Sequence, residues 1–324
     1  MTIDIETWVK VAAFTGSGLA MGLGAIGAAI GEGYTAAYAN SAISRSPNLS
    51  GEIFKSMLVG QAIAESASIF ALVIAMLLLF SDFSSQSCLM IMVPISAGLA
   101  MGFGAIGSGV GSGFPAGAAC MGIARQPAMS AKLTTNMLIG SAVCQTPAIF
   151  ALVTSFILLF TNFSSSPVSP TWAAILGAGL ASGLGAIGSG LGGGFVAGAS
   201  CEGIARQPNS ATTVTNVMLL GQAVTQTTAI YGLLISFILM FKTFAPTDSI
   251  AAAVALLGAG LSIGIGAIGP GIGEGLAAQS AVGAIAKNQK ATPDITRVML
   301  VGQAVSESTG IYSLVISLVL IFVI

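Results

Sequence analysis

The sequence repeats itself four times, and this periodicity restricts the chain to an array of similar units. A Gly-Ala-Ile-Gly segment begins at Gly24, Gly104, Gly185 and Gly266, which are 80, 81 and 81 residues apart. A second landmark, Gly-Gln-Ala or Gly-Ser-Ala, begins at Gly60, Gly140, Gly221 and Gly302 with the same spacings. The sequence therefore predicts four repeats, at about 1–84, 85–165, 166–246 and 247–324.

Each repeat contains two long apolar segments around a short polar one; in the first repeat these are 9–43 and 51–80, with 44–50 between them. The chain is 55% hydrophobic and 6% charged, whereas a soluble chain carries about 25% charged residues. A membrane span needs about 20 apolar residues, and only helices or closed barrels satisfy the backbone in lipid. We therefore predict an all-α integral membrane protein with eight transmembrane helices in four tandem hairpins. The net charge of −1 argues against a nucleic-acid partner.

The first helix of each repeat carries closely spaced glycines. In the fourth repeat they are Gly258, Gly260, Gly264, Gly266, Gly269, Gly271, Gly273 and Gly275. Glycines at spacings of two to four residues let neighbouring helix backbones approach closely. The Gly-x-Gly spacing is not a dinucleotide motif, because no strand precedes it.

The basic residues predict the orientation in the membrane. Eight of the ten lie in or beside the hairpin loops: Arg45, Lys55, Arg125, Lys132, Arg206, Lys287, Lys290 and Arg297. Lys10 and Lys242 lie near the other side, which also carries Asp4, Glu6, Asp82 and Asp248. The positive-inside rule then predicts cytoplasmic loops, with both termini outside.

Four glutamates interrupt the apolar helices, where a carboxylate costs on the order of 2.5–3.5 kcal/mol. They form two pairs, Glu32 with Glu65 and Glu274 with Glu307, each pair 33 residues apart. Folding a hairpin about its loop brings both members of a pair to a similar depth. A hydroxyl or amide could hold two helices together at lower cost, so the carboxylates indicate ion chemistry rather than packing.

The second and third repeats lose both carboxylates together. The position of Glu32 is occupied by Ser112 and Gly193, and that of Glu65 by Gln145 and Gln226. This joint loss indicates that each pair of glutamates works as one site.

Two motifs resemble the c-subunit, or proteolipid, of rotary ATP synthases and ATPases. The stretch from Gly302 to Tyr312, Gly-Gln-Ala-Val-Ser-Glu-Ser-Thr-Gly-Ile-Tyr, resembles the ion-binding segment of sodium-type c-subunits. The loops at Arg125-Gln126-Pro127 and Arg206-Gln207-Pro208 resemble the Arg-Gln-Pro loop of F-type c-subunits. The resemblance covers nearly the whole chain, although the loops at Arg45 and Lys287 depart from the pattern.

The resemblance implies a ring of hairpins in two concentric helix layers, made from several copies of the chain. Such a ring turns in the membrane, expected here to be a prokaryotic inner membrane, against the a-subunit of the stator, which presents an arginine. The central stalk contacts the loops, at Arg45, Arg125, Gln126, Pro127, Arg206, Gln207, Pro208 and Lys287. The chain has no phosphate-binding loop sequence, so we expect no catalytic activity and no cofactor, only a transported ion.

In sodium-type relatives, one hairpin supplies the carboxylates and its neighbour supplies a backbone carbonyl, hydroxyls and a tyrosine. The resemblance places this second half on Val305, Ser308, Thr309 and Tyr312 in the fourth repeat and on Val224, Thr227, Thr228 and Tyr231 in the third. The first and second repeats have Phe70 and Phe150 at the tyrosine position. If each repeat serves the carboxylates of the next one, two complete sites result, at Glu307 and, between chains, at Glu65.

Oxygen ligands suit a hard cation, and the hydroxyls favour Na⁺ over H⁺. The first-helix residue is glutamate rather than the glutamine of many sodium-type subunits, so a proton could be held beside Na⁺. Two sites in four hairpins also resemble the V-type rotor design, which favours ATP-driven pumping. The alternatives are a proton-translocating V-type-like rotor subunit, a structural or channel-forming hairpin protein, and a transporter with internal repeats.

Overall fold

The computed structural model describes residues 4–81 and 87–322, and every regular element in these ranges is helical. The α-helices are α1 (Ile5–Arg45), α2 (Ser50–Phe80), α3 (Met92–Arg125), α4 (Ser130–Phe160), α5 (Val168–Arg206), α6 (Ala211–Thr225), α7 (Thr227–Phe241), α8 (Ile250–Gly266), α9 (Ile268–Lys287) and α10 (Thr292–Phe322). Short 3₁₀ turns are η1 (Pro47–Leu49), η2 (Cys88–Ile91), η3 (Pro127–Met129), η4 (Pro208–Ser210) and η5 (Gln289–Ala291).

Eight helical stretches in the described part of the chain are long and apolar enough to cross a membrane. The predicted all-α membrane fold of four hairpins is therefore confirmed. The helices of each hairpin fall within one predicted repeat. The predicted boundary between 84 and 85, like Asp82, lies outside the described residues.

Two of the spans are interrupted near mid-length, which the sequence did not predict. One break, at Gln226, separates α6 from α7, and two threonine hydroxyls there bond backbone carbonyls: Thr225 to Gln222 at 2.7 Å and Thr227 to Val224 at 2.9 Å. Such bonds compete with the helical ladder. The other break, at Ala267, precedes Pro270, which has no N–H to donate to the carbonyl four residues earlier.

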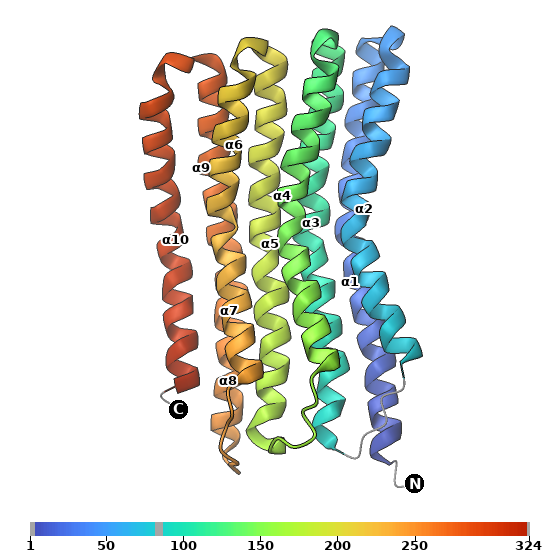
Figure 1. Ribbon diagram of the computed structural model, residues 1–324, viewed down its shortest axis with the longest axis vertical. Coiled ribbons are helices and arrows are strands. Elements are labelled where there is room, and N and C mark those ends of the chain that lie inside the picture. Colours follow the sequence, from blue (N-terminus) through green and yellow to red (C-terminus); the bar gives the residue numbers. More distant parts are fainter. Residues whose placement is uncertain (1–3, 82–86, 323–324) are drawn as a thin grey trace.

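All four hairpin loops lie at one end of the molecule, and α1 begins at the opposite end (Figure 1). In three of the loops a proline is the first residue of the 3₁₀ turn. At that position its missing N–H costs no helical hydrogen bond, and its restricted φ already suits the turn. At the other end Asp4 caps α1. Hydrogen bonds from the hydroxyl and backbone N–H of Thr7 hold the pKa of Asp4 below its ordinary value.

The hairpins stand side by side in chain order and form two layers. In Figure 1, α2, α4 and α6–α7 stand in front of first helices of the hairpins, and α10 stands at the left edge beside α9. The first helices contact one another in sequence, α1 with α3, α3 with α5, and α5 with α8 and α9. Each front helix up to α7 also contacts the first helix of the following hairpin, as α2 does with α3 and α4 with α5.

The first-helix layer is held by direct backbone contact at glycines. A Cβ built on Gly31 would lie 2.2 Å from the carbonyl oxygen of Gly109, and one on Gly111 2.0 Å from that of Gly190. The same contact occurs between Gly192 and Gly271, at 2.1 Å. No side chain fits at these distances, so the predicted glycine packing is present at each successive hairpin boundary.

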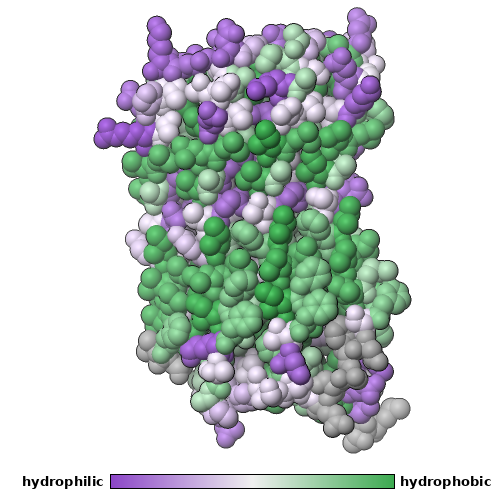
Figure 2. All heavy atoms as spheres, viewed as in Figure 1, coloured by the Kyte–Doolittle hydropathy of each residue, from purple (hydrophilic) through white to green (hydrophobic). Residues whose placement is uncertain are grey.

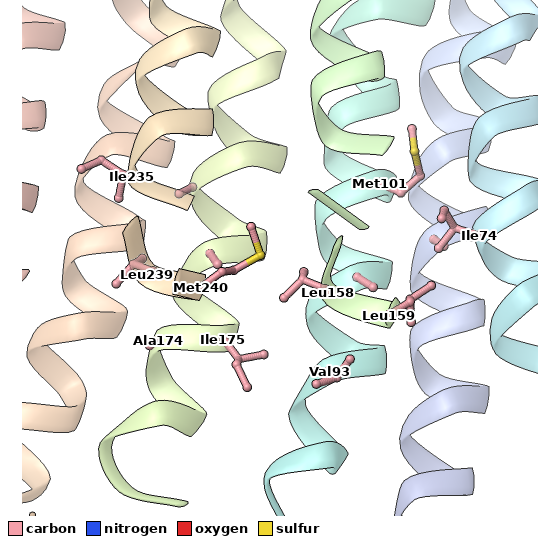
Figure 3. Close-up of a cluster of buried hydrophobic side chains, with 14 of the residues drawn as sticks. Ile74, Val93, Met101, Leu158, Leu159, Ala174, Ile175, Ile235, Leu239 and Met240 are labelled. Carbon is pink, nitrogen blue, oxygen red and sulfur yellow. The ribbon is translucent and has the colours of Figure 1, made fainter. Parts of the chain in front are cut away.

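Two apolar cores lie at different depths. One lies toward the loops and includes Ile53, Met137 and Met218. The other lies toward the opposite end and includes Met101, Leu158 and Ile235; Figure 3 shows these side chains spread across the layers, each between neighbouring helices. On the outer face, Figure 2 shows two apolar bands separated by a polar band.

Gly192→Ala should destabilise the packed hairpins by about 1–3 kcal/mol, because the new methyl group would meet the backbone of Gly271. The measurement is the temperature at which the purified assembly dissociates in detergent. Gly283→Ala is the matched control, since nothing lies within 4 Å of a Cβ there. The corresponding residue of the third repeat, Glu202, is exposed although hairpins flank it on both sides. Equal effects of the two substitutions would contradict the packing argument.

Candidate functional site

The four predicted site glutamates, near the middle of their spans, differ in their exposure. Glu274 is completely buried, with 0% of its surface exposed. Glu307 and Glu32 are half-buried, and Glu65 is exposed. Each pair comes from the two helices of one hairpin: Glu32 and Glu65 from α1 and α2, Glu274 and Glu307 from α9 and α10.

A hydrogen bond joins the third repeat to the carboxylate of the fourth. The hydroxyl of Tyr231, on α7, donates to Oε1 of Glu307, on α10, at 2.5 Å. A tyrosine of one hairpin thus holds a carboxylate of the next hairpin along the chain. This is the direction in which the sequence pairs the two halves of a site.

Oxygen atoms cluster at the same level of α6 and α7. The Thr227 hydroxyl donates to the carbonyl of Val224 at 2.9 Å, so these two predicted ligands are adjacent. The Thr228 hydroxyl instead pairs with that of Ser189 on α5, at 2.7 Å. Ser189 was not among the predicted residues, and it also accepts the backbone N–H of Ala229 at 3.1 Å. Its position is serine, alanine or proline in the four repeats, so the sequence carries only a weak signal for it.

The carboxylate of Glu274 is enclosed by the protein. Neither Oε1 nor Oε2 has a hydrogen-bond partner among the described atoms, although the side chain is fully buried. A buried carboxylate in this environment needs a proton or a cation to offset the loss of water. No cluster of three or more His, Cys, Asp or Glu side chains occurs in residues 4–81 and 87–322, so a cation here would rest on two carboxylates and neutral oxygens.

Glutamines hold the hairpins in register at this depth, a role that the sequence reasoning missed. Nε2 of Gln303 donates to the carbonyls of Glu274 at 3.2 Å and Gly221 at 3.0 Å. Nε2 of Gln222 repeats this one hairpin earlier, to Gly193 at 3.0 Å and Gly140 at 2.9 Å. The recurrence of the Gly-Gln-Ala landmark is the sequence signal that could have predicted this role.

The other predicted half-sites lie on opposite edges of the chain. Val305 and Tyr312, on α10, are 67% and 66% exposed. Ser308 donates to the Val305 carbonyl at 2.7 Å, and Thr309 is exposed. Glu65 lies on α2, at the far side of the row of hairpins (Figure 1). One chain by itself therefore does not bring Glu65 and Tyr312 together.

The predicted loop residues lie together at one end of the molecule. Arg45, Arg125, Arg206 and Lys287 are each the last residue of a first helix, and all four are exposed. Gln126 and Gln207 are the C-caps of α3 and α5, and Pro127 and Pro208 begin the next 3₁₀ turns. Arg206 pairs with Glu202 at 3.1 Å.

The chain has tandem membrane hairpins with carboxylates near the middle of the helices, and one of these carboxylates is bonded by the neighbouring hairpin. These features are typical of ion-carrying membrane proteins. Comparison with known proteins gives the family. Residues 15–78, 95–158, 176–239 and 257–320 each match the ATP synthase C-subunit family. The chain belongs to this family, whose members are the non-catalytic, ion-translocating rotor subunits of rotary ATP synthases.

Individual relatives support the assignment both over most of the chain and over single hairpins. The chain is 31% identical to the K-subunit of the A-type ATP synthase of Methanocaldococcus jannaschii over 72% of its own length and 98% of the relative. It is 53% identical over 68 residues to the ATP synthase c-subunit of Petrotoga mobilis, covering 21% of this chain and 71% of the relative. It is also 53% identical over 70 residues to the c-subunit of Alkaliphilus oremlandii, covering 22% of this chain and 78% of the relative. The short relatives therefore correspond to about one hairpin of this chain.

Tyr231→Phe should expose Glu307 to the carboxylate reagent dicyclohexylcarbodiimide, because the carboxylate loses the hydrogen bond that crosses the hairpin boundary. A hydrogen bond to such a group contributes about 1.5–3 kcal/mol, so we expect labelling to change by about tenfold or more. Mass spectrometry of the labelled peptides measures each glutamate separately. Tyr312→Phe is the matched control and should leave Glu307 unchanged. Equal changes at Glu65 and Glu307 in the Tyr231 variant would contradict the assignment.

Proposed function

We propose that this chain is a rotor-ring subunit that carries Na⁺ at two sites, one at Glu274 and Glu307 and one at Glu32 and Glu65. The observation that carries the proposal is the hydrogen bond from Tyr231 to Glu307, which crosses from one hairpin to the next. It supports a site built from two neighbours, with the Val224 carbonyl and the hydroxyls of Thr227 and Thr228 on the same side as Tyr231.

The second site forms between two chains of the ring. The fourth repeat of one chain offers Val305, Ser308, Thr309 and Tyr312, and the first repeat of the next chain offers Glu32 and Glu65. The exposure of Tyr312, Val305 and Glu65 on opposite edges supports this arrangement. Gln61 supports it too: its Nε2 donates to the backbone carbonyl of Glu32 at 3.2 Å, as Nε2 of Gln303 does to the backbone carbonyl of Glu274. Its second acceptor then corresponds to Gly302 of the adjoining chain.

One Na⁺ and one proton occupy each site. Two carboxylates with a single Na⁺ leave one negative charge, and repulsion between like charges in a medium of low dielectric constant favours protonation of one of them. Na⁺ is exchanged as the site passes a stator arginine, while the shared proton stays. A rotor that carries only protons is the alternative, and the carboxylates alone would suffice for it.

The loop end faces the cytoplasm and contacts the central stalk, with both termini outside. The exposed Arg45, Arg125, Arg206 and Lys287 at that end support this orientation in a prokaryotic inner membrane.

Na⁺ should protect Glu65 and Glu307 from dicyclohexylcarbodiimide in the purified complex. Bound Na⁺ lowers the labelled fraction by about tenfold when its concentration is about ten times the half-protecting value. Labelling rates with and without NaCl, mapped by mass spectrometry, measure this. Protection by raised pH without protection by Na⁺ would show a proton-carrying rotor.

The halved number of sites should favour ATP-driven pumping. Fewer ions per turn means that each ATP works against a steeper gradient, and synthesis needs a larger driving force. Reconstituted enzyme should therefore build a steep Na⁺ gradient from ATP. Net ATP synthesis at a modest ion gradient would count against this bias.

A further inference from the structure

Gln145, in the second repeat, which lacks both carboxylates, is held by an unusual set of contacts. Its side chain is 6% exposed and occupies the position of Glu65 and Glu307. Its Nε2 lies 2.7 Å from Oγ of Ser112, 3.0 Å from the carbonyl oxygen of Ile63 and 3.4 Å from that of Ser108. One nitrogen atom thus sits among three oxygen atoms from two hairpins.

These oxygens come from the positions that flank the proposed ion at the other boundary. Ile63, on α2, corresponds to Val224, and Ser112, on α3, corresponds to Glu274. The nitrogen therefore lies between a carbonyl of the preceding hairpin and the first-helix residue of its own. This is where a cation would lie in a site built from Val224, Glu274 and Glu307.

The hydrogen-bond donors and acceptors around Gln145 explain why the nitrogen of its amide, rather than the oxygen, faces these three atoms. The Ser112 hydroxyl donates its own proton to the carbonyl of Ser108, at 2.8 Å, so its oxygen is left to accept. Carbonyl oxygens only accept, so each of the three oxygen atoms around Nε2 can take a hydrogen bond from the amide. The carbonyls of Ser108 and Ile63 each also accept a hydroxyl of their own helix, from Ser112 at 2.8 Å and from Ser66 at 2.6 Å, whereas the Ser112 oxygen takes its bond from Gln145. The oxygen end of the amide would be repelled here, which settles the orientation of the side chain on chemical grounds.

We propose that the amide nitrogen of Gln145 takes the place of the cation at the boundary between the first and second repeats. The partial positive charge of the NH₂ group satisfies the oxygens, and the boundary holds together with no ion. Gln145 is then the residue that excludes ions from this boundary. The equivalence with an ion site rests on the proposed function, but the hydrogen bonds of Gln145 do not.

Gln226 shows that glutamine alone does not produce this arrangement. It is also buried, with 8% exposed, but neither end of its amide has a hydrogen-bond partner among the described atoms. Gly193 replaces Ser112 there, and a Cβ built on it would still lie 3.7 Å from Nε2 of Gln226. The serine and the glutamine act as a pair, and the third repeat has lost the serine.

The test replaces the nitrogen by oxygen in the assembled ring. Gln145→Glu should create a cage of oxygens that needs a cation, so the ring should dissociate at a lower temperature in choline chloride and recover in NaCl. Dicyclohexylcarbodiimide should label the new carboxylate, about tenfold more slowly at about ten times the half-protecting Na⁺ concentration. Gln226→Glu is the matched control, and it should show only the Na⁺ response of the unaltered ring.

The inference is overturned if Gln145→Glu shows no extra response to Na⁺, or if Gln226→Glu responds equally. Native Glu65 and Glu307 are read in the same samples, so a failure of the sodium assignment is seen there separately. If Na⁺ protects neither native glutamate, the dissociation temperature of the Gln145→Glu ring is measured against pH instead, because a proton would fill the same cage of oxygens. A pH dependence no larger than that of the unaltered ring overturns the inference.

A second pair of variants decides the question if Gln145→Glu does not assemble. Ser112→Ala removes the shortest bond to Nε2 and should lower the dissociation temperature by a few degrees. Gly193→Ala adds a methyl group at ordinary contact distance, 3.4 Å from Sγ of Cys144, and should not. Equal temperatures for the two variants would overturn the inference.

Discussion

Neighbouring first helices are held together by backbone contact between their glycines, and the placement of the other helices follows from this contact. Gly111 approaches Gly190, and Gly192 approaches Gly271, so closely that no side chain fits between them. This spacing narrows the first-helix layer, and the bulkier second helices then lie outside, each up to α7 against two first helices. It also brings the second helix of one hairpin beside the next hairpin, where Tyr231 can reach Glu307. Glycine packing thus makes contacts between the polar side chains of neighbouring hairpins possible.

Polar groups concentrate at one depth because two apolar cores lie on either side of it. At that depth the polar groups differ from one hairpin boundary to the next. Between the third and fourth repeats, buried Glu274 has no hydrogen-bond partner among the described atoms, so a cation or proton can stabilise it. Between the first and second, Gln145 supplies a donor from the protein itself. The repeats share a fold while their boundaries differ in charge, and under the proposed function this difference sets how many ions the rotor carries per turn.

Fusion of the hairpins gives the chain two unlike edges. A ring of identical single hairpins has identical boundaries, whereas here the order of the repeats decides which hydroxyls meet which carboxylates. The third repeat carries Tyr231 and precedes a repeat with glutamates, while the first carries Phe70 and precedes one without them. In the proposed ring, the exposed Tyr312 meets the first repeat of the next chain. One chain then carries both the boundaries proposed to bind an ion and those proposed to bind none.

The four repeats, the eight spans, the glycine face and the two glutamate pairs could be predicted from the amino-acid sequence, because periodicity and the cost of charge in lipid do not depend on how the helices pack. The resemblance to sodium-type c-subunits implied the pairing of Tyr231 with Glu307, and the hydrogen bond between them agrees with it. The three-dimensional structure was needed to show that the helix breaks at Gln226 between α6 and α7, that Thr228 bonds Ser189, and that Gln145 lies among oxygens of two hairpins. These features depend on side-chain rotamers and on the register between helices, which are set by packing across boundaries rather than by any local pattern.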